Sequence, residues 1–154
     1  MADLVPYQEG LFAPADYKRV GLVYLVRGPS EIKANDWTAL SLTSEFLVLC
    51  DRTRASFRTS LMNVRKCRVE AINDLTITVP SSFGPQIVAP VLPYAVVVTY
   101  IHMPGVVGDE RELTLYVGYR DVAQEWVNEI YGAIDRCHEA DRRRVAGKSG
   151  QRSS

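Results

Sequence analysis

The stretch of residues 37–50, WTALSLTSEFLVLC, decides the fold. Its first part, residues 37–42, alternates leucines with small side chains, and its last part, residues 46–50, is a continuous apolar run. Both patterns are typical of β-strands. Only residues 43–45 separate the two parts, and a link this short predicts an antiparallel hairpin, because a parallel crossover needs about a dozen residues.

Other segments on both sides of this hairpin have the β-branched and alternating composition of strands. They are 20–26, 56–61, 66–71 (resuming at 75–79), 94–101 and 112–117. The segments are joined by short links, so we expect about seven antiparallel strands in one sheet. The chain thus predicts a mainly β fold.

One amphipathic helix is predicted after the last strand. Val122, Trp126, Ile130 and Ile134 recur every three or four residues, and charged side chains occupy the opposite face. A helix over residues 121–143 would be roughly 33 Å long. We expect its last turns to extend beyond the sheet, because the segment that follows is polar.

This order of elements resembles the pleckstrin-homology superfold, including its GRAM relatives. The resemblance rests on WTALSLTSEFLVLC (37–50), SFRTSLMNV (56–64) and EWVNEIYGAI (125–134), and it extends over residues 19–140. It implies a seven-stranded, partly open antiparallel barrel, capped by the helix through Trp126. We expect three parts: an N-terminal arm (1–18), the PH-like barrel with its helix (19–141) and a disordered basic tail (142–154).

Composition excludes several functional classes. The chain has 154 residues, 47% of them hydrophobic, and 18 basic residues balance 18 acidic ones. A general nucleic-acid binder should carry a positive surplus, so a nucleic-acid partner is not expected. No apolar run approaches the roughly 20 residues of a transmembrane helix. The absence of a secretory signal and three widely spaced cysteines favour a cytoplasmic location, with peripheral membrane contact as an addition.

Catalytic and metal sites are not expected. The two histidines, His102 and His138, have no nucleophile or carboxylate at a recognisable spacing. The cysteines at 50, 67 and 137 lack the close pairing of a zinc site. We therefore predict a protein that is not an enzyme and that has no cofactor or metal.

The segment Pro80–Pro93, PSSFGPQIVAPVLP, is the first candidate for a binding surface. Its four prolines exclude a helix and a central strand, yet it is rich in apolar side chains. The candidate partner-binding residues are Phe83, Ile87, Val88, Val91 and Leu92, together with Met103, Val106 and Val107 from a second loop. Two readings stay open, because these side chains can cover the sheet or bind a partner. The leading hypothesis is a non-enzymatic adaptor, or a subunit of an assembly, that binds a protein.

Anionic lipid is the alternative ligand. In the pleckstrin-homology family, the loops after strands one, three and six meet at the open end of the barrel, where many members bind inositol phosphates. The resemblance implies such a site here, and together with the basic tail the candidate residues are Arg27, Lys33, Arg52, Arg54, Arg142, Arg143 and Arg144. The three loops contain four basic and five acidic residues, so only weak lipid binding is expected.

Overall fold

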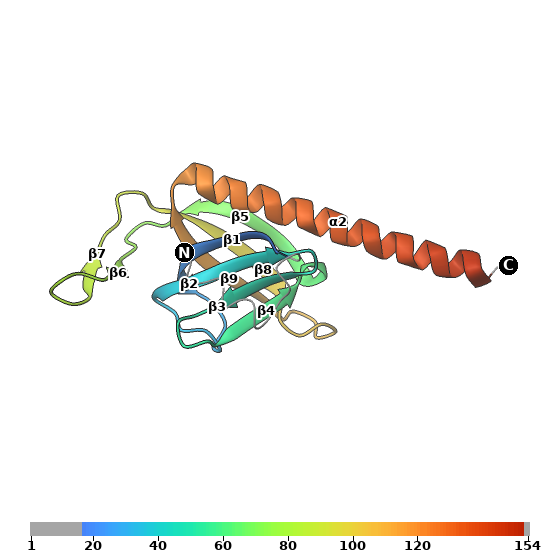
Figure 1. Cartoon of the computed structure of the whole chain (residues 1–154), viewed down its shortest axis with the longest axis horizontal. Helices are drawn as coiled ribbons and strands as arrows, with labels where there is room; N and C mark the ends of the chain where they lie inside the picture. The colour runs from blue at the N-terminus through green and yellow to red at the C-terminus, as the bar shows by residue number, and fades with distance from the viewer. Residues whose placement is uncertain (1–16, 153–154) are drawn as a thin grey trace.

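A computed structural model describes residues 17–152, with a seven-stranded antiparallel sheet, a separate two-stranded hairpin and a long C-terminal helix (Figure 1). The strands of the large sheet are β1 (Tyr17–Arg27), β2 (Asp36–Thr43), β3 (Phe46–Cys50), β4 (Ser56–Ser60), β5 (Val64–Ala71), β8 (Tyr94–Ile101) and β9 (Glu110–Gly118). The hairpin consists of β6 (Ile77–Val79) and β7 (Gln86–Val88), the 3-10 helix η2 (Leu61–Asn63) joins β4 to β5, and α2 spans Arg120–Arg152. The predicted N-terminal arm, residues 1–18, lies outside the described residues apart from its last two.

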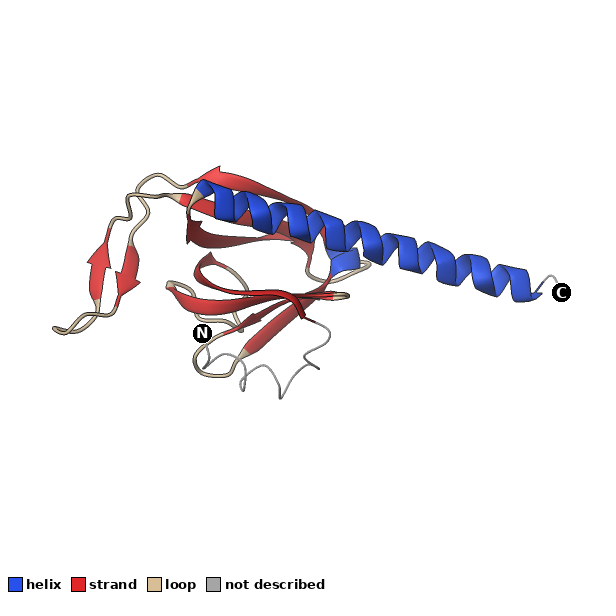
Figure 2. Cartoon of the chain, turned by 45° about the horizontal axis from the view of Figure 1, so that its top comes forward, coloured by secondary structure: helices blue, strands red, loops and turns tan. Residues whose placement is uncertain are grey.

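The large sheet has the order β4-β3-β2-β1-β9-β8-β5, and all neighbouring strands are antiparallel. Strand β1 joins its two halves, since Tyr24 lies opposite Trp37 of β2 and also opposite Tyr116 of β9. The two halves form two layers, and α2 lies along one of them (Figure 2). The sheet is not closed, because β4 and β5 stand at the two ends of the order. The prediction of a mainly β fold with one C-terminal helix is therefore confirmed.

The main core lies between the two layers and the helix. Alternate residues of the strands point into it, as the period of two in a strand requires. Its fully buried members include Leu40, Leu42, Leu47, Leu49, Val96, Val98, Leu113 and Leu115. Trp126 and Ile130 add the helix to the same core.

Trp126 is buried, as predicted, and its surroundings explain a glycine in β1. A Cβ atom on Gly21 would lie 2.9 Å from Cζ2 of Trp126, so only glycine lets the indole approach the strand this closely. The Arg19 guanidinium lies 4.6 Å from the centre of the same ring and forms ion pairs with Glu125 and Glu129. The helix is thus held to β1 by both packing and charge.

Helix α2 also covers part of the outer edge of β5. The Tyr131 hydroxyl donates to the carbonyl oxygen of Cys67 at 3.0 Å and accepts from the Cys67 N–H at 3.1 Å. Unpaired backbone groups at a sheet edge invite pairing with another chain. Tyr131 satisfies the two groups of Cys67, which makes this position of the edge unavailable to a further strand.

The helix is longer than the sequence pattern predicts, and it ends at Arg152 instead of residue 143. Its last turns extend beyond the sheet, as expected (Figure 1). The segment from residue 142, predicted as a disordered tail, is helical up to Arg152. Arginine, alanine and lysine have high helix propensity, and an ion pair between Glu139 and Arg143, four residues apart, supports the helix near residue 142.

Candidate functional site

The segment Ile72–Pro93 forms an ordered extension of the sheet, which we call the hairpin extension. Its base is closed by a hydrogen bond from the Ile72 N–H to the Pro93 carbonyl oxygen at 3.0 Å. Strands β6 and β7 pair within it, with Ile77 opposite Val88. The sequence pattern predicts a loop over residues 80–93, so strand β7 is a correction. The prolines at 80, 85, 90 and 93 flank the paired residues, and therefore none removes a donor from the ladder.

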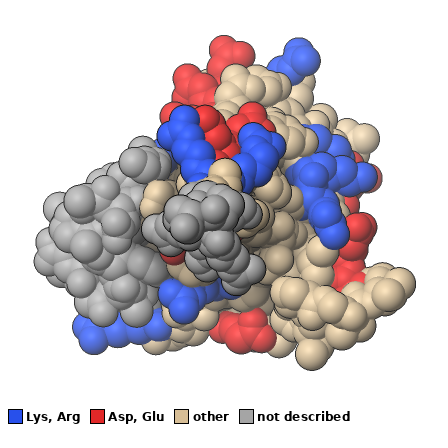
Figure 3. All heavy atoms as spheres, turned by 90° about the vertical axis from the view of Figure 1, so that its right-hand side faces the viewer, with Lys and Arg blue, Asp and Glu red and all other residues tan. Residues whose placement is uncertain are grey.

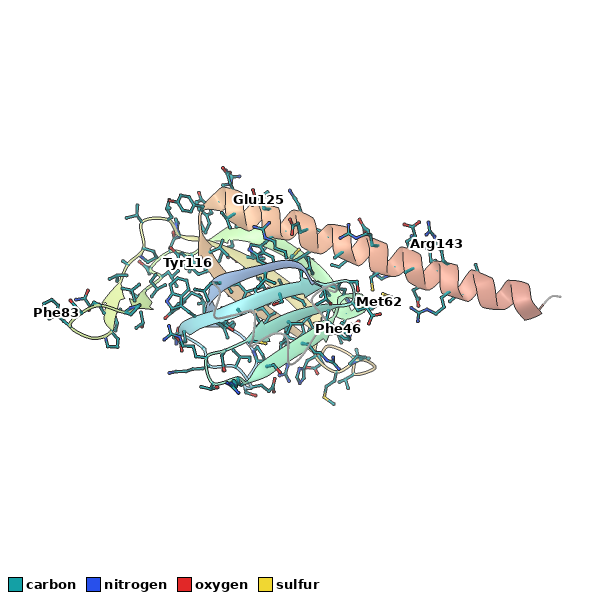
Figure 4. The ribbon with its side chains drawn as sticks, in the orientation of Figure 1. Phe46, Met62, Phe83, Tyr116, Glu125 and Arg143 are labelled. Atoms are coloured by element: carbon teal, nitrogen blue, oxygen red, sulfur yellow. The ribbon has the colours of Figure 1, made fainter. Side chains whose placement is uncertain are left out.

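A tight turn forms the free end of the hairpin extension. The Gly84 N–H donates to the Ser81 carbonyl oxygen at 3.1 Å, and the Phe83 N–H donates to the Ser81 hydroxyl at 3.2 Å. Gly84 has φ of +101°, a conformation that glycine adopts without steric cost. The turn fixes Phe83 at the tip, far from the base near Tyr116 (Figure 4).

Two aromatic side chains of the large sheet anchor the hairpin extension at Thr78. The Trp37 indole N–H donates to the Thr78 carbonyl oxygen at 3.1 Å, and the Thr78 N–H donates to the Tyr24 hydroxyl at 3.3 Å. The two rings meet edge to face with their centres 5.3 Å apart. Ile77 and Val88 pack against the same aromatic group, which also includes Tyr116. The backbone of β6 is therefore held by both hydrogen bonds and burial.

Four apolar side chains of the extension, from its tip (Phe83) to the segment just before its base (Val91 and Leu92), are exposed. Phe83 is 93% exposed, Ile87 75% and Val91 94%, and Leu92 is exposed to a smaller extent. Val88 is different, since it points toward the aromatic group and covers the sheet. The structure thus divides the predicted residues: Val88 has a packing role, and the other four are exposed.

The uncharged character of this region is a signal that the sequence analysis missed. Residues 75–108 contain no Asp, Glu, Lys or Arg, although charged residues make up 23% of the chain. The run includes the outer part of the hairpin extension, β8 and the tip of the next loop. A search for long gaps between charges would have found it.

Met103, Val106 and Val107 are also exposed, but on a separate surface. They lie in the loop between β8 and β9, whereas the hairpin extension ends directly before β8. The eight residues of β8 place the two surfaces roughly 24 Å apart. Behind the loop tip lies an open hollow of about 350 Å³, lined by residues that include Arg65, Val106 and Asp109. The structure therefore does not combine all predicted partner-binding residues in one site.

Two of the loops proposed for lipid binding are held together by Asp51. Its carboxylate accepts hydrogen bonds from the Thr53 N–H (2.8 Å), the Thr53 hydroxyl (2.7 Å), the Ala55 N–H (3.0 Å) and the Lys33 N–H (3.4 Å). Burial raises the pKa of Asp51, but these hydrogen bonds outweigh burial, and the pKa lies below its ordinary value. Asp51 thus fixes the loops after β1 and β3 side by side.

The basic side chains of these loops do not form one positive cluster. Lys33, Arg52 and Arg54 are exposed, but Arg52 lies 3.8 Å from Asp36, an oppositely charged neighbour. Arg27 borders a different hollow of about 380 Å³ that also contains Glu70 and Glu112.

The segment that was predicted as a disordered tail supplies three exposed arginines, on the part of α2 that extends beyond the sheet. They are Arg142, Arg143 and Arg144. Helix α2 packs against η2, and Leu61 of η2 bonds to Glu45 in the turn between β2 and β3. The loops with Lys33 and Arg52 lie at the opposite ends of these strands. Basic and acidic side chains are also mixed on the face seen from the C-terminal end of the helix (Figure 3). The anionic-lipid hypothesis stays a prediction.

Among residues 17–152, no group of three or more His, Cys, Asp or Glu side chains is placed to hold a metal ion. Burial raises the pKa of both the Cys50 and the Cys67 thiols to about 11, so these thiols are protonated at neutral pH. No helix in this range has both the length and the apolar character that crossing a bilayer requires.

No protein-family model matches the chain, and no curated protein matches it either.

Proposed function

We propose that this chain is a PH-like, non-enzymatic interaction module that binds a protein partner through its hairpin extension. The strand order of the sheet, the single helix after the last strand and the buried Trp126 support the PH-like assignment. In this proposal the sheet and helix are the scaffold, and the hairpin extension is the feature added to it.

The exposed apolar side chains of an anchored hairpin are the observation that carries the proposal. Single exposed apolar residues are common on protein surfaces, but a group of them on a projecting element is typical of an interaction site. Phe83, Ile87 and Val91 are each at least 75% exposed, while the base of the same element is held by Trp37 and Tyr24. Burial of each of these side chains by a partner would contribute about 1.5–3 kcal/mol.

The order of the hairpin extension favours specific binding. Because Thr78 is fixed on both its N–H and its carbonyl group, the base of the hairpin is ordered before a partner binds, which lowers the entropic cost of binding. The tip contains no charged residue, so its partner should offer an apolar cleft rather than a charged one. Such a cleft would take Phe83 as its central anchor, since aromatic residues commonly dominate binding energies.

A triple variant of the exposed apolar residues tests this function. The chain with Phe83→Ser, Ile87→Ser and Val91→Ser should lose the proteins that the intact chain captures from extracts of its native cells. The exposed positions make little contribution to folding, so the variant should keep its stability within about 0.5 kcal/mol. Unchanged recovery of every captured protein would contradict the proposal.

A matched control uses the second apolar surface. Met103→Ser, Val106→Ser and Val107→Ser remove a comparable number of exposed apolar side chains from the loop between β8 and β9. This control should keep the captured proteins. If the control loses them and the triple variant of the hairpin extension keeps them, the partner binds the loop instead.

Sedimentation with vesicles tests the alternative ligand. The intact chain should not sediment with vesicles of phosphatidylcholine and phosphatidylserine at low salt, because acidic neighbours compensate the positive charges of the loops. Pelleting that disappears in Arg52→Ala with Arg54→Ala would support the anionic-lipid hypothesis and weaken the protein-binding proposal.

A further inference from the structure

Positive charge is concentrated in the last turns of α2. Residues 142–152 contain five basic residues and no Asp or Glu. The preceding part of the helix, residues 120–141, contains six acidic and two basic residues. The equal totals of the whole chain, which argued against a nucleic-acid partner, therefore hide a strongly positive segment.

This positive segment, which we call the basic overhang (residues 142–152), projects beyond the sheet (Figure 1). Three of its arginines, at positions 142, 143 and 144, are exposed, and Arg143 lies on the projecting part of the helix in Figure 4. Among the described residues, these arginines form a single ion pair, from Arg143 to Glu139 at 2.7 Å. The guanidinium groups of Arg142 and Arg144 thus keep their donors available for an anionic partner.

Helical geometry distributes these charges around the basic overhang. Consecutive residues of an α-helix lie about 100° apart, so Arg142 to Arg144 span about 200° of the circumference. A helix that lies on a membrane needs an apolar face opposite its basic face, and Val145 is the one large apolar residue in 142–152. A partner with negative charge on both sides of the helix fits this arrangement better than a membrane surface does.

We propose that the basic overhang binds the phosphate backbone of duplex DNA. The major groove of DNA is about 12 Å wide and admits an α-helix, with phosphates along both of its walls. The guanidinium fork of arginine matches the geometry of phosphate oxygens. The corresponding groove of duplex RNA is too narrow for a helix.

The rest of the chain confines this contact to the basic overhang. Residues 1–141 contain 13 basic and 18 acidic residues, so their net charge repels phosphates. A second copy of the chain is a weaker candidate, because exposed ion pairs contribute too little to offset the entropy lost on association. The inference is independent of the proposed function, since the hairpin extension lies at the other end of the molecule (Figure 1).

Fluorescence anisotropy of a labelled DNA duplex of mixed sequence, titrated with the full chain over a range of salt concentrations, tests the contact. Neutralisation of about three to five phosphates predicts that the logarithm of the association constant falls linearly with the logarithm of the salt concentration, with a slope of about −2.7 to −4.5. The triple variant Arg142→Gln, Arg143→Gln and Arg144→Gln should flatten this slope by about 2.7 and weaken binding at low salt by about tenfold or more. Lysine at the same three positions should keep the slope, because it neutralises a phosphate as arginine does.

A control variant with the same change of total charge uses exposed arginines of the loops and of β5. Arg52→Gln, Arg54→Gln and Arg65→Gln should leave the slope unchanged. No binding of the intact chain to the duplex at low salt would overturn the proposal, and so would equal weakening in both glutamine variants. Sedimentation with phosphatidylserine vesicles that depends on the arginines at 142–144, in a chain that does not bind the duplex, would assign the basic overhang to a membrane and overturn it as well.

Discussion

The clamp at Thr78 predicts a local loosening when Trp37 is replaced by phenylalanine. The substitution keeps an aromatic ring next to Tyr24 but removes the indole N–H that donates to the Thr78 carbonyl oxygen at 3.1 Å. An acceptor left without its donor costs about 1–3 kcal/mol when it is buried. Trp37 is only partly buried, so water compensates in part and the lower end, about 1 kcal/mol, applies.

This energy should appear as faster opening of the hairpin extension alone. About 1 kcal/mol corresponds to a roughly fivefold increase in the open population. Hydrogen exchange measured by mass spectrometry should therefore show about fivefold faster exchange for the amides of β6 and β7 in Trp37→Phe. The amides of β3 and β8 should exchange as in the unmodified chain, because they belong to the large sheet.

Tyr24→Phe is the companion variant, since it removes the hydroxyl that accepts the Thr78 N–H. It should accelerate the same amides. Unchanged exchange of β6 and β7 in both variants would refute the clamp, and an equal acceleration throughout the sheet would show that Trp37 stabilises the whole fold instead.

Three further predictions concern stability. Trp126→Ala should cost about 3–5 kcal/mol and lower Tm by roughly 6–20 °C in calorimetry, and a smaller shift than this range would contradict its burial in the core. Phe83→Ser should change the unfolding free energy in urea by less than about 0.5 kcal/mol, whereas a larger loss would mean that the tip packs on the body. Burial raises the pKa of the Cys50 and Cys67 thiols from 9.0 to about 11, so the folded chain keeps protons that the unfolded chain loses. The contribution of these two thiols to the unfolding free energy should thus keep its full value below pH 9 and decrease as the pH rises toward 11. The double variant Cys50→Ala with Cys67→Ala should show a smaller decrease over this range.

The sequence predicts most strands because their apolar runs end at turn residues. The runs 46–50 and 94–101 coincide with β3 and β8. Strand β9 begins two residues before the predicted segment 112–117, because Glu110 pairs with Ile101 across the ladder. A charged residue at this position carries no local strand signal, and only its partner on β8 places it in the sheet.

The remaining differences depend on long-range contacts. Pairing of β6 with β7 depends on a clamp from Trp37 and Tyr24, which are about forty residues or more away along the chain. The sequence identifies Phe83 and Val88 equally as apolar loop residues, and only the register of the hairpin separates an exposed tip from a buried base. Residue types thus indicated the apolar residues that are exposed, while their division into two separate surfaces required the length and direction of β8.

Site-specific photo-cross-linking in cells tests the central claim most directly. A benzophenone amino acid placed at position 83 reports which molecules contact the tip, and the same amino acid at position 107, which is also fully exposed, serves as the control. We predict a discrete cross-linked protein band from position 83 that is absent from position 107 and that Ile87→Ser weakens. The absence of any protein adduct at position 83, or the same band from both positions, would contradict the role of the hairpin extension in partner binding.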